Sequence, residues 1–257
     1  MVVVGLDIGS VAAKGVILTP DKPHRALLPT GWSPRDAGEQ LIDQLLCLSG
    51  RKAADIEDIV ATGYGRASIP AARRVVSEIK CHARGIAAIC PEVRTIVDIG
   101  GQDSKVIRVD NDGRVVDFAM NDKCAAGTGR FLQVMANALG MDVSELGTAG
   151  THRDPAIINS MCTVFAETEI ISLLARGVDK ERIIGGIHLS VARRVAAMAR
   201  RMGVEEKVAF TGGVALNPAV RQALAGELDC ELVIPPNCQF TGALGAALLA
   251  REQLVVS

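Results

Sequence analysis

One short pattern occurs twice in this chain of 257 residues and constrains its fold more than any other feature. An apolar run leads into Asp7-Ile8-Gly9, and Lys14 follows seven positions after the aspartate. The second copy is Asp98-Ile99-Gly100 with Lys105, at the same spacing and again between apolar runs. A pattern repeated at matched spacing indicates two related structural units. The chain is long enough to form two small lobes.

Each copy is predicted to form a β-hairpin with a glycine-containing turn. The strand before the turn delivers the aspartate, and glycine lets backbone N–H groups approach a phosphate without a Cβ in the way. The aspartate would hold a hydrated Mg²⁺ through water, because Mg²⁺ gives up its water ligands reluctantly. The repeat therefore predicts a phosphate site built from two similar turns.

The rest of the chain alternates between strand and helix patterns. The expected elements are helices over residues 37–48 and 71–88, strands over 58–63 and 114–120, helices that follow the loop ending at 130, the turn ending at 167 and the cap at 179, and a Gly/Ala-rich helix over 242–250. In the first helix, Leu41, Leu45 and Leu48 share one face. A third glycine-rich turn, Thr211-Gly212-Gly213, follows a further apolar strand. Such alternation predicts an α/β fold.

Composition and charge exclude several classes of function. The formal net charge is −1 and no basic stripe runs along the chain, which argues against nucleic acid as a partner. No apolar stretch reaches the ~18 residues that a membrane span needs. The apolar N-terminal run lacks a charged segment before it and is typical of a strand rather than a signal peptide. We therefore expect a cytoplasmic protein without a membrane partner.

The seven cysteines do not follow a familiar ligand spacing. They are Cys47, Cys81, Cys90, Cys124, Cys162, Cys230 and Cys238, and no two of them form a CxxC pair. A zinc ribbon and a self-contained ferredoxin-type loop are therefore excluded. Cys124 lies in a small-residue loop, residues 121–130, and Cys162 lies in the turn of residues 159–167. Both precede predicted helices, whose N-termini stabilise negative charge. For the other five cysteines, core packing is favoured.

The ordered set of motifs resembles the acetate kinase, sugar kinase, Hsp70 and actin superfamily. It is more closely similar to the activators of 2-hydroxyacyl-CoA dehydratases and, less closely, to the ATPase subunits of benzoyl-CoA reductase. The motifs that carry this resemblance are Asp98-Ile-Gly-Gly-Gln-Asp103, Asn121-Asp-Lys-Cys-Ala-Ala-Gly-Thr-Gly-Arg-Phe131, Cys162 with Phe165-Ala-Glu167, and Thr211-Gly-Gly-Val-Ala215. They cover almost the whole chain.

The resemblance implies two ribonuclease-H-like, actin-like lobes with a nucleotide cleft between them. Residues 1–94 and a C-terminal helix over 241–257 would form the first lobe, and residues 95–240 would form the second lobe with the cluster cysteines. It also implies a homodimer that holds one 4Fe-4S cluster. Such a cluster takes four thiolates, and Cys124 and Cys162 would supply two from each chain across a two-fold axis.

The resemblance further implies roles for individual residues. Asp7 and Asp98 would organise Mg²⁺, while Gln102 or Asp103 would orient the attacking water. The implied ATP- and ADP-binding residues are Gly9, Ser10, Val11, Ala12, Ala13, Lys14, Gly100, Gly101, Gln102, Gly127, Gly129, Gly212, Gly213 and Gln239. Among these, Gly212, Gly213 and Gln239 would hold the adenosine. Val11 departs from the threonine common in such activators, so a hydroxyl contact to phosphate or Mg²⁺ is lost.

The implied function is an ATPase that passes a low-potential electron to an iron–sulfur dehydratase or reductase, with ferredoxin or flavodoxin as the electron donor. One alternative is a small-molecule kinase of the same superfamily, such as an amino-sugar kinase, which would need no cluster. The other is a non-catalytic scaffold that binds nucleotide. His82 receives no role, because a lone helix histidine is more often structural.

Overall fold

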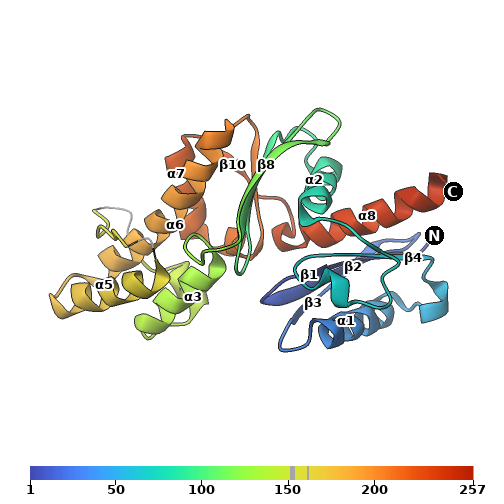
Figure 1. Cartoon of the computed structure of the whole chain (residues 1–257), viewed down its shortest axis with the longest axis horizontal. Coiled ribbons are helices and arrows are strands. Elements are labelled where there is room, and N and C mark those ends of the chain that lie inside the picture. The colour runs from blue at the N-terminus through green and yellow to red at the C-terminus, as the bar shows by residue number, and fades with distance from the viewer. Residues whose placement is uncertain (151–153, 161, 257) are drawn as a thin grey trace. The chain divides into compact units, whose positions relative to one another are not determined.

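The computed structural model describes residues 1–150, 154–160 and 162–256. The chain divides into two compact units, and Figure 1 colours the chain by residue number. The first unit comprises Met1–Ile96, Val109–Val116 and Pro235–Ser257, and the second comprises Val97–Arg108 and Asp117–Ile234. These units differ from the lobes expected from the sequence at residues 95–96, 109–116 and 235–240, which were expected in the second lobe but group with the first unit by their contacts.

The elements of the first unit form a sheet covered by helices. They are β1 (Val3–Ile8), β2 (Ala12–Leu18), β3 (Pro23–Pro29), α1 (Pro34–Ser49), η1 (Ala53–Asp55), β4 (Asp58–Thr62), η2 (Arg66–Ser68), β5 (Arg74–Val75), α2 (Glu78–Ile89), η4 (Cys238–Phe240) and α8 (Thr241–Val256). The strand order is β3-β2-β1-β4-β5, with β1, β2 and β3 antiparallel to their neighbours in the hairpins and β4 parallel to β1.

The remaining elements form the second sheet and its helices. They are β6 (Thr95–Ile99), β7 (Ser104–Val109), β8 (Val115–Asn121), α3 (Gly129–Ala138), α4 (Val143–Leu146), α5 (Thr163–Ala175), α6 (Lys180–Met202), β9 (Val208–Thr211), η3 (Gly213–Leu216), α7 (Pro218–Leu228) and β10 (Leu232–Val233). The order β8-β7-β6-β9-β10 repeats the order of the first sheet strand for strand. Within the described residues there are thus two five-stranded sheets of the same topology, which confirms the two-lobed α/β fold.

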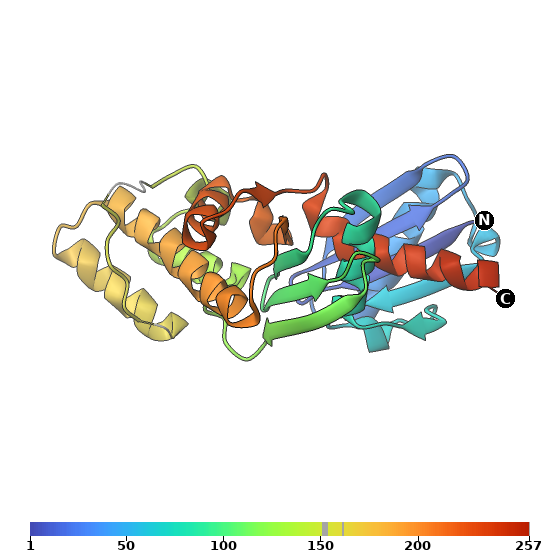
Figure 2. The same cartoon turned by 90° about the horizontal axis from the view of Figure 1, so that it is seen from above.

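The central strand β1 is buried on both faces because its side chains alternate between two helical layers. Val4, Leu6 and Ile8 point into a core that includes Leu41 and Leu45 of α1. Val3 lies in the opposite core, with Ala243, Ala246 and Ala247 of α8. Figure 2 shows α8 running across this sheet. By the same alternation Asp7 lies on the α8 side, where the chain has its smallest side chains.

Helices α2 and α8 approach one another at the distance that only glycine permits. A Cβ on Gly245 of α8 would overlap the carbonyl oxygen of Cys81, and one on Gly85 of α2 would overlap that of Thr241. A Cβ on Gly5 of β1 would likewise overlap the carbonyl oxygen of Ala243. The predicted close packing of the Gly/Ala-rich C-terminal helix is therefore confirmed, and it holds both helices on the sheet.

Two local predictions were wrong. The helix expected over residues 71–88 begins only at Glu78, because Ser77 accepts a hydrogen bond from the Lys80 N–H and caps it. The preceding Arg74–Val75 instead forms β5, parallel to β4. Leu48 was expected on the buried face of the first helix, but it is exposed on the last turn of α1.

The helix contact generates a prediction about stability. Replacing Gly245 by Ala should lower the free energy of unfolding by at least about 1–3 kcal/mol, because the added methyl group meets rigid backbone. The matched control is Gly226→Ala in α7, where nothing lies within 4 Å of the added methyl group. That change should raise stability by about 0.5–1 kcal/mol. Denaturant titration measures both, and equal stability of the two variants would contradict the close packing.

Candidate functional site

The first glycine turn joins β1 to β2 and is closed by its own backbone. The Gly9 N–H donates to the Ala12 carbonyl at 3.2 Å. Thr30 braces the turn from outside, because its hydroxyl donates to the Gly9 carbonyl at 2.6 Å and its N–H donates to the Val11 carbonyl at 3.0 Å. The Val11 side chain is half-exposed, at 53%. The turn therefore has a fixed shape, with residue 11 at its exposed tip.

Asp7 is buried beside this turn in a space that glycine residues keep open. A Cβ on Gly63 would lie 2.7 Å from Asp7 Oδ1, and one on Gly242 would lie 3.1 Å from Asp7 Oδ2. A Cβ on Gly242 would also lie 3.1 Å from Nε2 of the buried His82. His82 Nδ1 in turn lies 3.0 Å from the Thr241 hydroxyl. His82, to which the sequence assigned no role, thus belongs to the surroundings of the Asp7 carboxylate.

The second turn joins β6 to β7 and repeats this geometry. Only four residues connect the strands, so the pair is antiparallel, and the Gly100 N–H donates to the Asp103 carbonyl at 2.9 Å. The buried Asp98 accepts a hydrogen bond from the Thr211 hydroxyl at 2.8 Å. A Cβ on Gly100 would lie 2.5 Å from Asp103 Oδ1. The Asp103 carboxylate is therefore folded back over the turn.

The lysines of the two copies have different environments. Lys14 Nζ lies 3.9 Å from Asp7 Oδ2, and its side chain is partly exposed. Lys105 is buried, with its ammonium 2.8 Å from Asp103 and 3.5 Å from Asp98. A buried ammonium between two carboxylates neutralises part of their charge. Lys14 is thus placed to meet a ligand, while Lys105 holds the acidic residues of its own turn.

Each aspartate is also covered by a Thr-Gly pair on the neighbouring strand, and this part of the repeat was missed in the sequence. Gly63 follows Thr62 at the end of β4, and Gly212 follows Thr211 at the end of β9. Both glycines have φ near +90°, at +90° and +88°. A Cβ on either would overlap the carbonyl oxygen after the aspartate. The signal was present, because Thr-Gly follows an apolar strand in both halves of the chain.

The second turn is bonded directly to the start of α3. The Gly129 N–H donates to the Gly100 carbonyl at 2.9 Å, and the Arg130 N–H donates to the Gly101 carbonyl at 2.7 Å. A Cβ on Gly129 would lie 3.1 Å from the Gly100 oxygen, so glycine permits this approach. Gly127, predicted to bind nucleotide, is buried at φ +81° against the Arg194 side chain. Both glycines therefore shape the loop that attaches to the turn.

The residues predicted to hold adenosine are divided between the two units. Gly213 opens η3 in the second unit, and nothing lies within 4 Å of a Cβ built on it. Its backbone is thus approachable, unlike that of Gly212. Gln239 lies in η4 of the first unit and is half-buried.

Cys124 lies in the loop before α3, and Cys162 lies directly before α5, which packs against α3. Cys124 is half-buried in the loop before α3, and Cys162 is the exposed N-cap residue of α5. Helices α3 and α5 lie side by side in the second unit (Figure 1). Met161, in the predicted turn before α5, lies outside the described residues. Both cysteines precede a helix as expected, but only Cys162 lies at a helix N-terminus, since α3 begins five residues after Cys124.

The expectation that the other cysteines are buried holds for three of five. Cys81, Cys90 and Cys238 are buried, whereas Cys230 is half-buried and Cys47 is exposed on α1. Cys47 was misplaced because it lies next to the apolar face of an amphipathic helix. Burial raises the pKa of Cys81 to about 12 and also raises the pKa of Cys90 and Cys230. These three remain protonated thiols, which are poor ligands for iron.

The surroundings of Cys162 suit a negatively charged group. The thiol lies at the N-terminus of a helix of 13 residues, whose first N–H groups carry partial positive charge. Next to it, the Thr163 hydroxyl oxygen is buried and finds no hydrogen-bond partner among the described residues. Among the described residues, no three His, Cys, Asp or Glu side chains gather into a metal site within one chain. The donor set therefore fits a cluster only if further thiolates come from a second chain.

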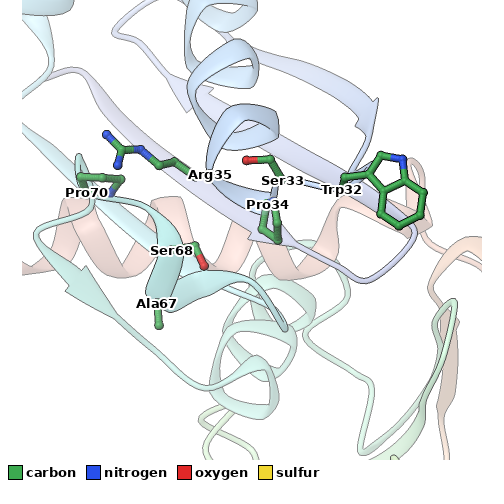
Figure 3. A pocket seen from close by; sticks show the side chains of 7 residues that line it. All are labelled: Trp32, Ser33, Pro34, Arg35, Ala67, Ser68 and Pro70. Atoms are coloured by element: carbon green, nitrogen blue, oxygen red, sulfur yellow. The ribbon is translucent and has the colours of Figure 1, made fainter.

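One pocket of about 540 Å³ opens between the start of α1 and η2 (Figure 3). Its lining consists of Trp32, Ser33, Pro34, Arg35, Ala67, Ser68 and Pro70. The Trp32 indole is fully exposed and points away from the other lining side chains in Figure 3. None of the predicted site residues lines this pocket. In the part of the chain that the structure describes, no helix has both the length and the apolar character for crossing a bilayer.

Comparison with known proteins places this site in a family. A family model described as "BadF/BadG/BcrA/BcrD ATPase family" matches residues 4–250. The chain is 47% identical over 255 residues to the 2-hydroxyisocaproyl-CoA dehydratase activator of Clostridioides difficile, covering 98% of this chain and 96% of the relative. It is also 47% identical over 253 residues to the (R)-2-hydroxyglutaryl-CoA dehydratase activating ATPase of Acidaminococcus fermentans, covering 97% and 96%.

Solved structures agree with the fold. The activator of the 2-hydroxyisocaproyl-CoA dehydratase from Clostridium difficile, solved with bound ADPNP, superposes with a TM-score of 0.91 at 45% identity, covering 100% of this chain and 96% of that one. A ROK family glucokinase from Streptomyces griseus superposes with a TM-score of 0.56 at 13% identity, covering 98% and 100%. The second likeness concerns the fold alone, so it adds nothing in favour of the kinase alternative.

The different settings of the two lysines predict different costs of removal. Lys105→Met should destabilise the protein by about 3–5 kcal/mol, because it leaves two carboxylates without their buried cation. Lys14→Met, at the equivalent position of the first turn, should cost less, about 1–2 kcal/mol, because its ammonium lies 3.9 Å from a single carboxylate and stays partly exposed. Denaturant midpoints of the two variants measure the difference. Equal losses would show that Lys105 does not hold the second turn.

Proposed function

Because the chain belongs to the BadF/BadG/BcrA/BcrD ATPase family, we propose that it is a homodimeric activator that couples ATP hydrolysis to electron transfer. The chain is an ATPase. The acceptor in this proposal is a 2-hydroxyacyl-CoA dehydratase or a related iron–sulfur reductase, and the donor is ferredoxin or flavodoxin. The observation that carries the proposal is the pair of bonds between the second phosphate turn and α3, which follows the Cys124 loop.

Nucleotide binding is assigned to the two glycine turns. The Gly9 N–H already closes its own turn, so the amides of Ser10 and Val11 are the ones left to meet phosphate. The Lys14 ammonium would add its charge, since it lies 3.2 Å from a Cβ built on Gly9. In this proposal Gly9, Ala12 and Ala13 shape the first wall of the phosphate site. The proposal also assigns phosphate contacts to Gly100, Gly101 and Gln102 of the second turn.

Hydrolysis is assigned to positioning rather than to covalent chemistry. The attacking water is oriented by the Gln102 amide, which is exposed at the tip of its turn. Asp103 is less free for that task, because the Lys105 ammonium lies 2.8 Å from its carboxylate. Asp7 and Asp98 would position Mg²⁺ through its water ligands. Gly212, Gly213 and Gln239 would hold the adenosine.

The cluster is assigned to Cys124 and Cys162 of two chains. When bound, a 4Fe-4S cluster supplies a one-electron donor of low potential. The helix N-terminus at Cys162 and the unpartnered Thr163 hydroxyl oxygen support this assignment. The apolar surface of α5 supports a second copy: Val164 and Phe165 are 66% and 67% exposed, while Ala166 and Ile170 are its buried residues. Exposed apolar surface of this kind marks an interface.

Coupling between the two sites follows from the bonds at the start of α3. Movement of Gly100 and Gly101 on nucleotide binding would pull on the N–H groups of Gly129 and Arg130. The loop between Cys124 and Gly129 would then move with them. Such a device is a two-state element whose balance the nucleotide biases.

The cysteine assignment predicts which variants lose iron. Anaerobically purified Cys124→Ala and Cys162→Ala proteins should each lose iron, acid-labile sulfide and the brown colour. Cys47→Ala is the control, because Cys47 is also exposed but lies in the first unit. It should keep the iron content of the wild type. Iron retained at the wild-type level in either variant would overturn the ligand role of that cysteine, and sugar phosphorylation by iron-free protein would favour the kinase alternative.

Val11 yields a prediction on turnover. Val11→Thr restores a hydroxyl at the exposed tip of the first turn, at no cost in core packing. One added hydrogen bond to phosphate or to a Mg²⁺ ligand should raise kcat/KM for ATP up to about tenfold. The isosteric control is Val16→Thr, which buries a hydroxyl in β2 and should not raise turnover. Steady-state kinetics decides, and an unchanged kcat/KM for Val11→Thr would contradict the assigned contact.

A further inference from the structure

The segment before Cys162 is held by one carboxylate. Glu169 lies on the second turn of α5 and points back toward the loop that enters the helix. Its Oε1 accepts from the Asn159 N–H at 3.0 Å, and its Oε2 accepts from the Ser160 N–H at 2.8 Å. The Asn159 side-chain amide adds a bond to Oε1 at 3.3 Å. Two consecutive backbone amides are therefore fixed by a single side chain of the helix that Cys162 caps.

Hydrogen bonds keep the Glu169 carboxylate charged. Burial pushes the pKa of Glu169 upward, but the hydrogen bonds from Asn159 and Ser160 outweigh it, so the pKa lies below its ordinary value. Bonds to an ionised acceptor are about twice as strong as neutral ones. Further back, the Ala156 N–H donates to the Arg182 carbonyl at 2.8 Å. The loop is thus attached to α6 at one point and to α5 at the next.

The Cys124 loop has an anchor of the same kind but of opposite polarity. Asn121, the last residue of β8, donates from its side-chain amide to the Cys124 carbonyl at 2.8 Å and to the Ala126 carbonyl at 3.1 Å. The Thr128 hydroxyl donates to the Ala125 carbonyl at 2.6 Å. One amide group therefore gathers the carbonyl groups on both sides of Ala125 and sets the path of the backbone through Cys124.

We infer that Glu169 and Asn121 are positioning residues for the two cluster cysteines, each fixing the backbone of one cysteine loop through a pair of hydrogen bonds. The inference rests on the proposed function, because the hydrogen bonds lie within one chain whereas the cluster that they would serve is part of that proposal. An anchored backbone limits how far each thiolate can move when its bond to iron opens. Ligand recapture then competes with loss of iron, so the anchors set how long a cluster survives.

The test compares Glu169→Gln with a matched control. A glutamine side chain offers one acceptor oxygen and turns an NH₂ group toward N–H donors, so both loop amides cannot be satisfied. The control is Glu145→Gln, because Glu145 Oε2 also accepts a backbone N–H, from Asp142 at 2.7 Å, but at the start of α4. Hydrogen exchange of the Asn159 and Ser160 amides is measured in the cluster-free chain, and release of iron to a ferrous chelator is measured in the loaded protein.

We expect Glu169→Gln to accelerate exchange of the two amides and release of iron by about tenfold each, as loss of one such bond implies. Glu145→Gln should change neither rate. Faster exchange with an unchanged rate of iron release would overturn the inference, since the anchor would then hold the loop without serving the ligand. That result would leave the proposed function standing. A wild-type chain that takes up no iron would instead overturn the proposed function and this inference together.

A second variant keeps the inference testable if Glu169→Gln does not fold. Asn121→Asp has nearly the same shape, but its carboxylate cannot donate to the Cys124 and Ala126 carbonyl groups. It should also release iron about tenfold faster. Asn137→Asp in α3 is its control, because that side chain accepts a bond from Gln133 and touches neither cysteine loop. Equal rates of iron release in Asn121→Asp and its control would overturn the role of Asn121.

Discussion

A buried carboxylate at the end of each central strand is the constraint on which the rest of the structure depends. Removing a charge from water is costly unless hydrogen bonds or an opposite charge compensate for it. Asp98 meets this requirement with the Thr211 hydroxyl and the Lys105 ammonium. Asp7 has a longer ion pair, to Lys14, and is closely surrounded by backbone that glycine residues leave open. The Asp-Gly-Lys repeat thus compensates the burial of its two aspartates, and under the proposed function it also binds the ligand.

The two copies have diverged in a way that suits different tasks. In the first turn the lysine is left partly free, and Thr30 braces the loop from outside. In the second turn Lys105 is fully engaged with acidic neighbours, and the carbonyl groups of the turn are engaged with the start of α3. Under the proposed function, the first turn is therefore the one whose lysine is available to phosphate. The second is mechanically joined to the helix that follows Cys124, so under the proposed function it is the turn that transmits a signal.

Helix α5 contributes three different features to the proposed cluster site. Its N-terminus faces Cys162, its second turn supplies Glu169 to the loop before that cysteine, and its outer surface stays apolar. One helix of 13 residues thus combines electrostatics, positioning and an interaction surface. In this proposal, a second copy covers the apolar surface and brings the cysteines of both chains together.

Local sequence patterns were enough for the repeat, the α/β class, both glycine turns and the two cysteines that precede helices, because spacing and turn chemistry act over a few residues. The same reasoning failed at the start of α2, where Ser77 capped a shorter helix and Val75 joined a strand. It also missed Thr62-Gly63, since only strand pairing brings this pair beside Asp7.

What the sequence by itself determined was therefore the set of chemical groups and the local turns that present them. Tertiary structure alone decided which groups meet: that Lys105 is buried between two acids while Lys14 is not, that α3 is bonded to the second turn, and that Glu169 reaches back to the Cys162 loop. The physical reason is that burial and long-range hydrogen bonds depend on the packing of distant segments, which no local pattern encodes.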